Sequence, residues 1–187
     1  IVGNRDLTFS VVRYGNVMGS RGSVIPFFLQ NAKSGTLTIT HKDMTRFNIT
    51  LKEGVNMVLW AIENSKGGEI FVPKLPSYRV VDLADAIGPN CAKQFNGTRP
   101  GEKIHEEMIT ASDSINTFDL GKYFAIIPEE FAGIVKTSKN IYLEEDAKVK
   151  KVPEGFSYSS GNNSDFLSIE SIRDLIRENI SSEFVPF

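Results

Sequence analysis

The chain has 187 residues, of which 41% are hydrophobic and 24% are charged. This mixture is typical of a soluble globular domain and excludes a disordered chain or a coiled coil. The 21 basic and 23 acidic side chains leave a net charge of -2, which gives no support for a nucleic acid partner.

The first elements are a strand, a loop and a helix. Residues 7–14 are rich in β-branched and aromatic side chains and end at Gly15, a pattern typical of a buried strand that enters a functional loop. Ser23 is a suitable N-cap for a helix with Pro26 in its first turn, ending at Ser34 and Gly35. A short strand over residues 36–40 is expected next.

The middle of the chain predicts two further helices with a strand between them. Residues 50–53 have the spacing of a capping box, and an apolar repeat at helical intervals follows until Gly67. Residues 69–72 predict a strand that ends at Pro73, and residues 78–87 predict a helix. A helix between two strands favours a right-handed crossover and a mixed α/β fold.

The last third has weaker patterns. Residues 98–103 predict a turn, followed by a short helical stretch over residues 104–108. Residues 148–153 and 158–165 are interpreted as surface loops. Ser168 is expected to cap a final amphipathic helix. No internal repeat is found.

Several classes of protein are disfavoured by what the sequence lacks. The longest nearly apolar run, residues 55–62, is far shorter than the ~20 residues that cross a bilayer, so no membrane partner is expected. The single cysteine, Cys91, has no partner for an internal disulfide, which favours a reducing cytoplasm. The chain opens on Ile1 without a signal peptide, and we interpret this beginning as a cut.

Basic residues gather near the start of the chain. Residues 1–50 hold six basic and two acidic side chains, whereas the remainder holds 15 basic and 21 acidic ones. The loop after the first strand adds three glycines, amides and hydroxyls to this basic region, which suits a phosphorylated small molecule. The glycines fit neither G-x-G-x-x-G nor a P-loop, so a structural turn is an equally good interpretation.

A second candidate phosphate site is the segment Arg99-Pro100-Gly101-Glu102. It places a bidentate donor before a tight turn and a carboxylate after it, although a surface salt bridge is the alternative. Glu102, His105 and Glu106 would share a helical face but lack the H-E-x-x-H pattern, so no metal site is predicted. No serine lies in G-x-S-x-G, which gives hydrolase chemistry no support.

Five blocks of the sequence carry a resemblance to a known family. They are VVRYGNVMGSRGSVIPFF, MTRFNITLKEGV, GGEIFVPKLPS, RPGEKIHEEMI and FSYSSGNN. In this order they resemble the C-terminal half of the inverting UDP-N-acetylglucosamine 4,6-dehydratases, a group of extended short-chain dehydrogenases/reductases of bacterial polysaccharide and nonulosonic acid biosynthesis. The expected fold is α/β, with the last strands of a Rossmann-type parallel sheet and the smaller substrate-binding lobe.

The resemblance implies a reaction and a cofactor. Such enzymes keep NADP, oxidise C4 of the sugar, eliminate water across C5 and C6, reduce C6 and invert C5. The glycine-rich cofactor loop and the catalytic residues of the family lie upstream of the YGNV block, so no catalytic residue is expected in this chain. Residues 1–90 would be the end of the NADP-binding domain interleaved with substrate-lobe elements, and residues 91–187 the substrate-binding lobe with the C-terminal helix.

The resemblance also implies particular site residues. Tyr14, Gly15 and Val17 would lie on the nicotinamide side of the cofactor. UDP-N-acetylglucosamine, or a similar UDP-sugar, would contact a set of polar residues: Asn16, Arg21, Thr40, Arg99, Glu102 and Asn163. The full-length enzyme is expected to be a homo-oligomer. A different nucleotide-sugar epimerase or dehydratase of the same fold, or a non-catalytic nucleotide-sugar-binding module, remain alternatives.

Overall fold

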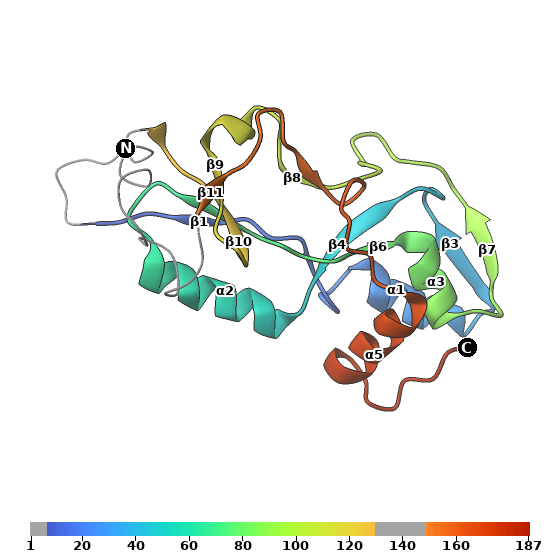
Figure 1. Ribbon diagram of the computed structural model, residues 1–187. Coiled ribbons are helices and arrows are strands. Elements are labelled where there is room, and N and C mark those ends of the chain that lie inside the picture. The colour runs from blue at the N-terminus through green and yellow to red at the C-terminus, as the bar shows by residue number, and fades with distance from the viewer. Residues whose placement is uncertain (1–6, 130–148) are drawn as a thin grey trace. The chain divides into compact units, whose positions relative to one another are not determined.

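The computed structural model describes residues 7–129 and 149–187. Within them the chain forms two compact units, each assembled from three separate segments. Among the described residues, unit 1 contains residues 7–14, 52–74, 107–129 and 149–158, and unit 2 contains residues 15–51, 75–106 and 159–187. Most of their helices and strands are labelled in Figure 1.

Unit 1 is built on a five-stranded sheet in the order β1-β5-β10-β9-β11. Strands β1 and β5 are parallel, and the remaining neighbours are antiparallel. Helix α2 packs Met57 and Ala61 against a core that includes Phe71 of the sheet. The strand bounds are β1 (Val11–Val12), β5 (Ile70–Pro73), β9 (Thr117–Asp119), β10 (Tyr123–Ile126) and β11 (Lys150–Lys151), and α2 covers Leu51–Asn64.

Shorter elements complete this part of the chain. A 3-10 helix, η1 (Asp113–Asn116), precedes β9. Strand β8 (Glu107–Ile109) pairs with β12 (Tyr158–Ser159). The side chain of Trp60 lies against the rings of Phe71 and Tyr123, with centroids 5.1 and 4.5 Å apart. Aromatic packing of this kind contributes beyond its buried area, so the core of unit 1 is mainly apolar and aromatic.

Within the described residues, unit 2 consists of two small sheets and three helices. One sheet has the order β2-β4-β6, with β2 parallel and β6 antiparallel to β4, and the other pairs β3 with β7 in parallel. Helices α1, α3 and α5 share one hydrophobic core (Figure 1). The bounds are β2 (Asn16–Val17), α1 (Val24–Ala32), β3 (Thr36–Ile39), β4 (Thr45–Ile49), β6 (Ser77–Arg79), α3 (Val80–Ile87), β7 (Ala92–Phe95) and α5 (Ile169–Asn179).

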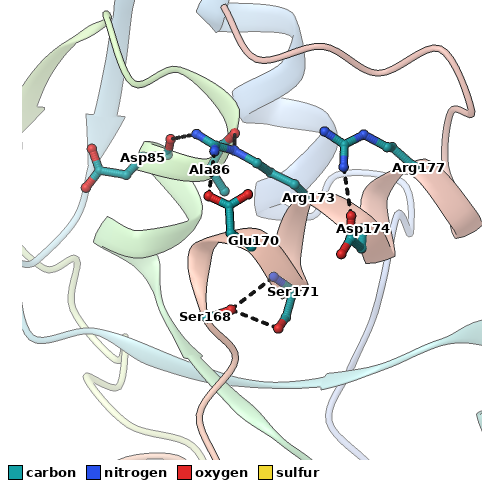
Figure 2. Close-up of polar contacts among 8 residues, drawn as sticks. All are labelled: Asp85, Ala86, Ser168, Glu170, Ser171, Arg173, Asp174 and Arg177. Atoms are coloured by element: carbon teal, nitrogen blue, oxygen red, sulfur yellow. Dashed lines mark hydrogen bonds and ion pairs between the residues drawn. The ribbon is translucent and has the colours of Figure 1, made fainter.

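Polar contacts fix helix α5 on α3 (Figure 2). Ser168 caps α5 by accepting the N–H of Ser171 at 3.1 Å, as the sequence predicted. Arg173 donates from Nε to the Ala86 carbonyl at 3.1 Å and from Nη2 to the Asp85 carbonyl at 3.3 Å. The last carbonyls of a helix have no partner within it, so Arg173 satisfies the end of α3 from a neighbouring helix.

The structure corrects three predictions of secondary structure. The buried strand expected over residues 7–14 is confined to Val11–Val12, and it is not buried, since Val11 is 53% exposed. The helix expected over residues 78–87 begins at Val80, because residues 77–79 form strand β6 beside β4. The segment 104–108 is not helical: its backbone bonds to residues distant in the sequence, and Glu107–Ile109 form β8.

The predicted loops of the last third are also partly wrong. Residues 150–151 and 158–159 are strands, and Ser160 is fully buried. Lys148, at the start of the first predicted loop, lies outside the described residues. The helices α1, α2 and α5 and the strands at residues 36–39 and 70–73 are confirmed. None of the described helices has the length and apolar character that a membrane crossing requires.

Candidate functional site

The loop between β2 and α1 is shaped by two consecutive turns. The N–H of Ser20 donates to the Val17 carbonyl at 3.2 Å, and the N–H of Ser23 donates to the Ser20 carbonyl at 3.1 Å. Gly19 and Gly22 have φ angles of +74° and +75°, in the left-handed region that favours glycine. The glycines of the predicted phosphate loop therefore have a definite backbone role.

Arg21, at the outer part of this loop, and Thr40, after β3, were both predicted to bind substrate. Arg21 is exposed, and Thr40 is half-buried. Among the described residues, no carboxylate forms an ion pair with Arg21. Its guanidinium is thus available to an anion, since arginine recognises phosphate with a fork of N–H donors.

Gly15 has a packing role that the sequence did not reveal. A Cβ atom built on Gly15 would lie 2.5 Å from the Cβ of Phe47 in β4. Because β2 is parallel to β4, glycine here allows the close approach of two backbones. Val17 is half-buried in β2, and Tyr14 is 41% exposed. The predicted contacts of these three residues with a cofactor stay predictions.

Arg99 and Glu102 are brought together as a turn. The N–H of Glu102 donates to the Arg99 carbonyl at 3.0 Å, and Gly101 has a φ of +82°, so Pro100 and Gly101 occupy the positions that a type II turn favours. The Glu102 carboxylate accepts the backbone N–H of Arg99 at 3.1 Å. In the described part of the chain, the Arg99 guanidinium has no ion-pair partner, so the turn presents it to solvent.

Asn16 meets Glu106, which the sequence did not single out as a ligand-site residue. The orientation of the Asn16 carboxamide that satisfies both groups directs its nitrogen to Glu106, with 2.8 Å to Oε2 and 2.5 Å to Oε1. Glu106 Oε2 also accepts the backbone N–H of Phe47 at 3.1 Å. Arg46 Nε lies 3.7 Å from Oε1. One carboxylate thus receives donors from β2 and β4.

The backbone around Glu106 is fixed by buried hydroxyl groups. Its N–H donates to Ser160 Oγ at 2.9 Å, and the Ser160 N–H donates to the Glu106 carbonyl at 2.8 Å. Ser160 Oγ also bonds Thr45 Oγ1 at 2.7 Å, and this oxygen bonds His105 Nδ1 at 2.8 Å. A Cβ on Gly161 would lie 2.6 Å from the His105 ring. His105 is therefore held between a hydroxyl network and a glycine.

The electrostatics of this cluster follow from burial. Burial raises the pKa of Glu106 above its ordinary value, while the Phe47 N–H and the Arg46 charge lower it. Arg46 also donates from Nη1 to the carbonyls of Thr45 and Ile104, at 2.7 and 3.1 Å. Burial in β6 likewise raises the pKa of Tyr78, and the nearby Glu106 charge raises it further. A carboxylate that is partly withdrawn from water needs its donors.

Asn163, the remaining predicted substrate residue, has a structural role in unit 2. Its side-chain nitrogen donates to the Leu75 carbonyl at 2.7 Å and to Ser77 Oγ at 3.0 Å. A third contact joins it to the Asp165 carbonyl at 3.1 Å. These bonds engage the amide donors, and the carbonyl oxygen accepts the Asp165 N–H at 3.4 Å, so only the second lone pair of that oxygen is left for a substrate. The predicted substrate contact stays a prediction.

The structure therefore joins some predicted residues and not others. Arg99 and Glu102 are hydrogen-bonded, whereas among the described residues no side-chain hydrogen bond or ion pair joins Asn16, Arg21, Thr40 and Asn163 to one another. Glu106 was missed because a helix at residues 104–108 would not bring it against β4, and Arg46 of β4 was missed because it pairs with Glu106. No group of three histidine, cysteine, aspartate or glutamate side chains within residues 7–129 and 149–187 could hold a metal ion.

Comparison with known proteins identifies relatives. The family model described as "Polysaccharide biosynthesis protein" matches residues 1–128. The chain is 45% identical over 179 residues to a UDP-N-acetylglucosamine 4,6-dehydratase (inverting) of Campylobacter jejuni, covering 94% of this chain and 53% of the relative. It is 39% identical over 171 residues to a UDP-glucose 4-epimerase of Rickettsia canadensis, covering 89% and 48%.

A solved structure supports the fold. The X-ray structure of Pen from Bacillus thuringiensis matches with a TM-score of 0.75 and 33% identity, over 91% of this chain and 50% of that one. The predicted α/β fold of the extended dehydrogenase type is thereby confirmed. The chain spans about half the length of the curated relatives that it matches. On the family match and these identities, the chain belongs to the polysaccharide biosynthesis protein family of nucleotide-sugar dehydratases and epimerases.

Proposed function

We propose that these residues form the substrate-binding part of an NADP-dependent UDP-N-acetylglucosamine 4,6-dehydratase that inverts C5 and acts in the cytoplasm on the way to a bacterial surface polysaccharide or nonulosonic acid. The observation that carries the proposal is the 45% identity with the Campylobacter dehydratase over 94% of the chain. Two exposed arginines without carboxylate partners in the described residues, Arg21 and Arg99, suit its diphosphate.

The binding steps follow from the side chains. The Arg99 guanidinium, presented by its turn, would bind the diphosphate of a UDP-sugar, and Arg21 would contribute a second charge. Thr40, Glu102 and Asn163 would add polar contacts. Asn16 would contact the sugar. Since no catalytic residue is assigned within this chain, its contribution to turnover is to bind and orient the substrate so that C4, C5 and C6 face the catalytic groups.

The cofactor would be shared with a part of the protein outside this chain. Tyr14, Gly15 and Val17 are the proposed contacts on its nicotinamide side. These residues offer backbone groups, an apolar side chain and an exposed ring, which fit the nicotinamide end of the cofactor but not its phosphates. When bound, NADP would accept hydride from C4 of the sugar and return it to C6. Residues 1–90 would include the end of its binding domain, and residues 91–187 would belong to the substrate lobe.

The reaction can be tested with the full-length protein and UDP-N-acetylglucosamine. We expect proton NMR to show a new methyl doublet, because C6 loses its hydroxyl, with the C5 configuration of the L-sugar. The identity with the Rickettsia epimerase favours a second candidate, a UDP-sugar 4-epimerase. That activity would change the configuration at C4 and leave the C6 hydroxymethyl group intact. Binding without turnover would instead indicate a nucleotide-sugar-binding module.

The role of Arg99 has its own test. Replacing it by alanine should weaken binding of the UDP-sugar by about 1–3 kcal/mol, the range for loss of a charged hydrogen-bonding group, as measured by calorimetry. Arg177→Ala is the matched control, because this exposed arginine lies on α5 and pairs with Asp174 at 2.7 Å. Equal affinities of wild type and Arg99→Ala would contradict the assignment. Sedimentation of the same full-length protein tests the proposed homo-oligomer.

A further inference from the structure

One flank of helix α2 carries apolar side chains that the described residues leave exposed. Helix α2 lies along the sheet of unit 1 (Figure 1) and packs on it through buried positions that include Met57 and Ala61. At about 3.6 residues per turn, the exposed apolar positions lie roughly 110° around the helix axis from the buried ones. These positions, called the α2 stripe below, are Val55, Val58, Leu59 and Ile62.

The α2 stripe faces the side of the sheet on which β1 lies. On the opposite flank of the helix, Trp60 packs against Phe71 of β5 and Tyr123 of β10. The stripe lies roughly 150° around the axis from Trp60, at about 3.6 residues per turn. Because β1 and β10 are the two neighbours of β5, the stripe points past β1.

Strand β1 is open on that same side. Val11 and Arg13 donate their N–H groups to the carbonyls of Glu69 and Phe71, both at 2.9 Å, so their backbone groups face β5. The intervening Val12 directs its own N–H and carbonyl away from β5, and within residues 7–129 and 149–187 these groups make no backbone hydrogen bond. An edge of this kind is a template for another strand.

We propose that the α2 stripe and the open edge of β1 together bind the part of the full-length protein that precedes residue 1, which adds a parallel strand beside β1 and a helix against the stripe. The inference rests on the proposed function in one respect, that the working protein is longer than these residues. The chain covers 53% of the Campylobacter dehydratase and 50% of Pen. About half of each of these proteins is thus available to cover such a surface.

The handedness of chain connections favours this occupant over a second copy of the chain. Strands β1 and β5 are parallel, and α2 lies between them in the sequence. Connections between parallel strands of one sheet are right-handed in about 98% of cases. A preceding strand beyond β1, joined to β1 through a helix, therefore places that helix on the same face as α2, against the stripe. A second copy would meet the side of α2 that points away from the sheet, where exposed polar residues lie: Lys52, Asn56 and Glu63.

Cross-linking within the full-length protein identifies what covers the stripe. A photoreactive benzophenone side chain is introduced in place of Leu59, and mass spectrometry locates the product. We expect an internal cross-link to a peptide that precedes residue 1. The same probe in place of Asn56, on the polar side of α2, is the matched control and should lose this product. A cross-link to a second copy, or only to peptides within residues 1–187, would overturn the inference.

A second measurement serves if the bulky probe prevents folding. In the full-length protein, Leu59→Cys should react with a maleimide at least about tenfold more slowly than Asn56→Cys, because a covered thiol reacts only after local opening. Peptide mapping separates both positions from Cys91. Equal rates, or protection that is lost when dilution dissociates an oligomer, would overturn the inference. The proposed function fails separately, if wild-type protein neither binds nor converts UDP-N-acetylglucosamine while position 59 stays protected.

Discussion

The two units differ in what holds them together. The core of unit 1 is apolar and aromatic, with Phe71 fully buried between α2 and its neighbouring strands. Both units also contain buried polar side chains. In unit 1 the Glu69 carboxylate accepts the N–H groups of its neighbours Lys66 and Gly67, whereas in unit 2 the hydrogen bonds through Thr45, Glu106 and Ser160 join segments distant in the chain. Buried polar networks specify one arrangement only when every member is satisfied. The candidate ligand residues other than Tyr14 belong to unit 2.

The outer face of α2 sharpens the contrast. The apolar repeat that identified this helix in the sequence does not face the core of unit 1. The side chains of this repeat are exposed, from 39% at Val58 to 70% at Ile62. The buried positions of the helix are Gly54, Met57 and Ala61. Periodicity thus located the helix correctly, but it did not identify the face that packs within this chain.

The largest expected effect is in the core of unit 1. Phe71→Ala should lower the free energy of unfolding by about 3–5 kcal/mol, because it removes a fully buried ring and leaves a cavity. Urea unfolding of the full-length protein measures this change. Phe95→Ala is the control, since Phe95 in β7 is 52% exposed. Equal effects of the two substitutions would contradict the account of unit 1.

The second-largest loss of stability is expected from the hydrogen-bond network of unit 2. Ser160→Ala removes the acceptor of the Glu106 N–H and the partner of Thr45, and unsatisfied buried groups cost about 1–3 kcal/mol. The same urea titration checks this value. Ser164→Ala, nearby at an exposed position, should change stability by less than about 0.5 kcal/mol. If Ser160→Ala lowered the free energy of unfolding by less than about 0.5 kcal/mol, the network would contribute little to stability.

Arg173 and Arg177 form a matched pair on α5 (Figure 2). Arg173→Ala should cost about 1–2 kcal/mol of stability, because its guanidinium bonds two carbonyls at the end of α3. Arg177→Ala should cost at most about 0.5 kcal/mol, since an exposed i,i+3 ion pair is screened by solvent. Thermal unfolding of both variants measures the two losses of stability. A larger loss for Arg177→Ala than for Arg173→Ala would exclude docking of α5 through Arg173.

The smallest effect is a pH dependence at Glu106. Because burial raises its pKa in the folded state, the folded protein binds this proton more tightly than the unfolded chain does. The resulting stabilisation is complete below about pH 4.5, the ordinary value, and is lost as pH rises through the raised pKa. Glu106→Gln lacks this titration, so its stability relative to wild type should rise with pH. Urea unfolding of both proteins, measured from about pH 4 to about pH 8, checks this. The prediction would be wrong if the stability of Glu106→Gln minus that of wild type fell as pH rose.

Local signals in the sequence were sufficient for several elements. The Ser168 cap, the Pro100-Gly101 turn and the breaks at Gly35 and Gly67 depend on a few neighbouring residues, and their geometry is settled within one turn of backbone. The blocks of resemblance were equally local, and they led to the family that the comparisons show. For these features, short-range sterics and hydrogen bonds dominate over distant contacts.

Only the tertiary structure decided the cluster around Glu106. The segment 104–108 has spacing compatible with a helix, but Glu106 bonds to Ser160 and Phe47, which lie 54 and 59 positions away in the chain, and such bonds draw the backbone into an extended form. Similarly, Gly15 is required by the approach of Phe47. The sequence by itself determined the family, the caps and the turns. The pairing of Asn16 with Glu106 arose from folding, because hydrogen bonds between distant segments leave no periodic pattern in either one.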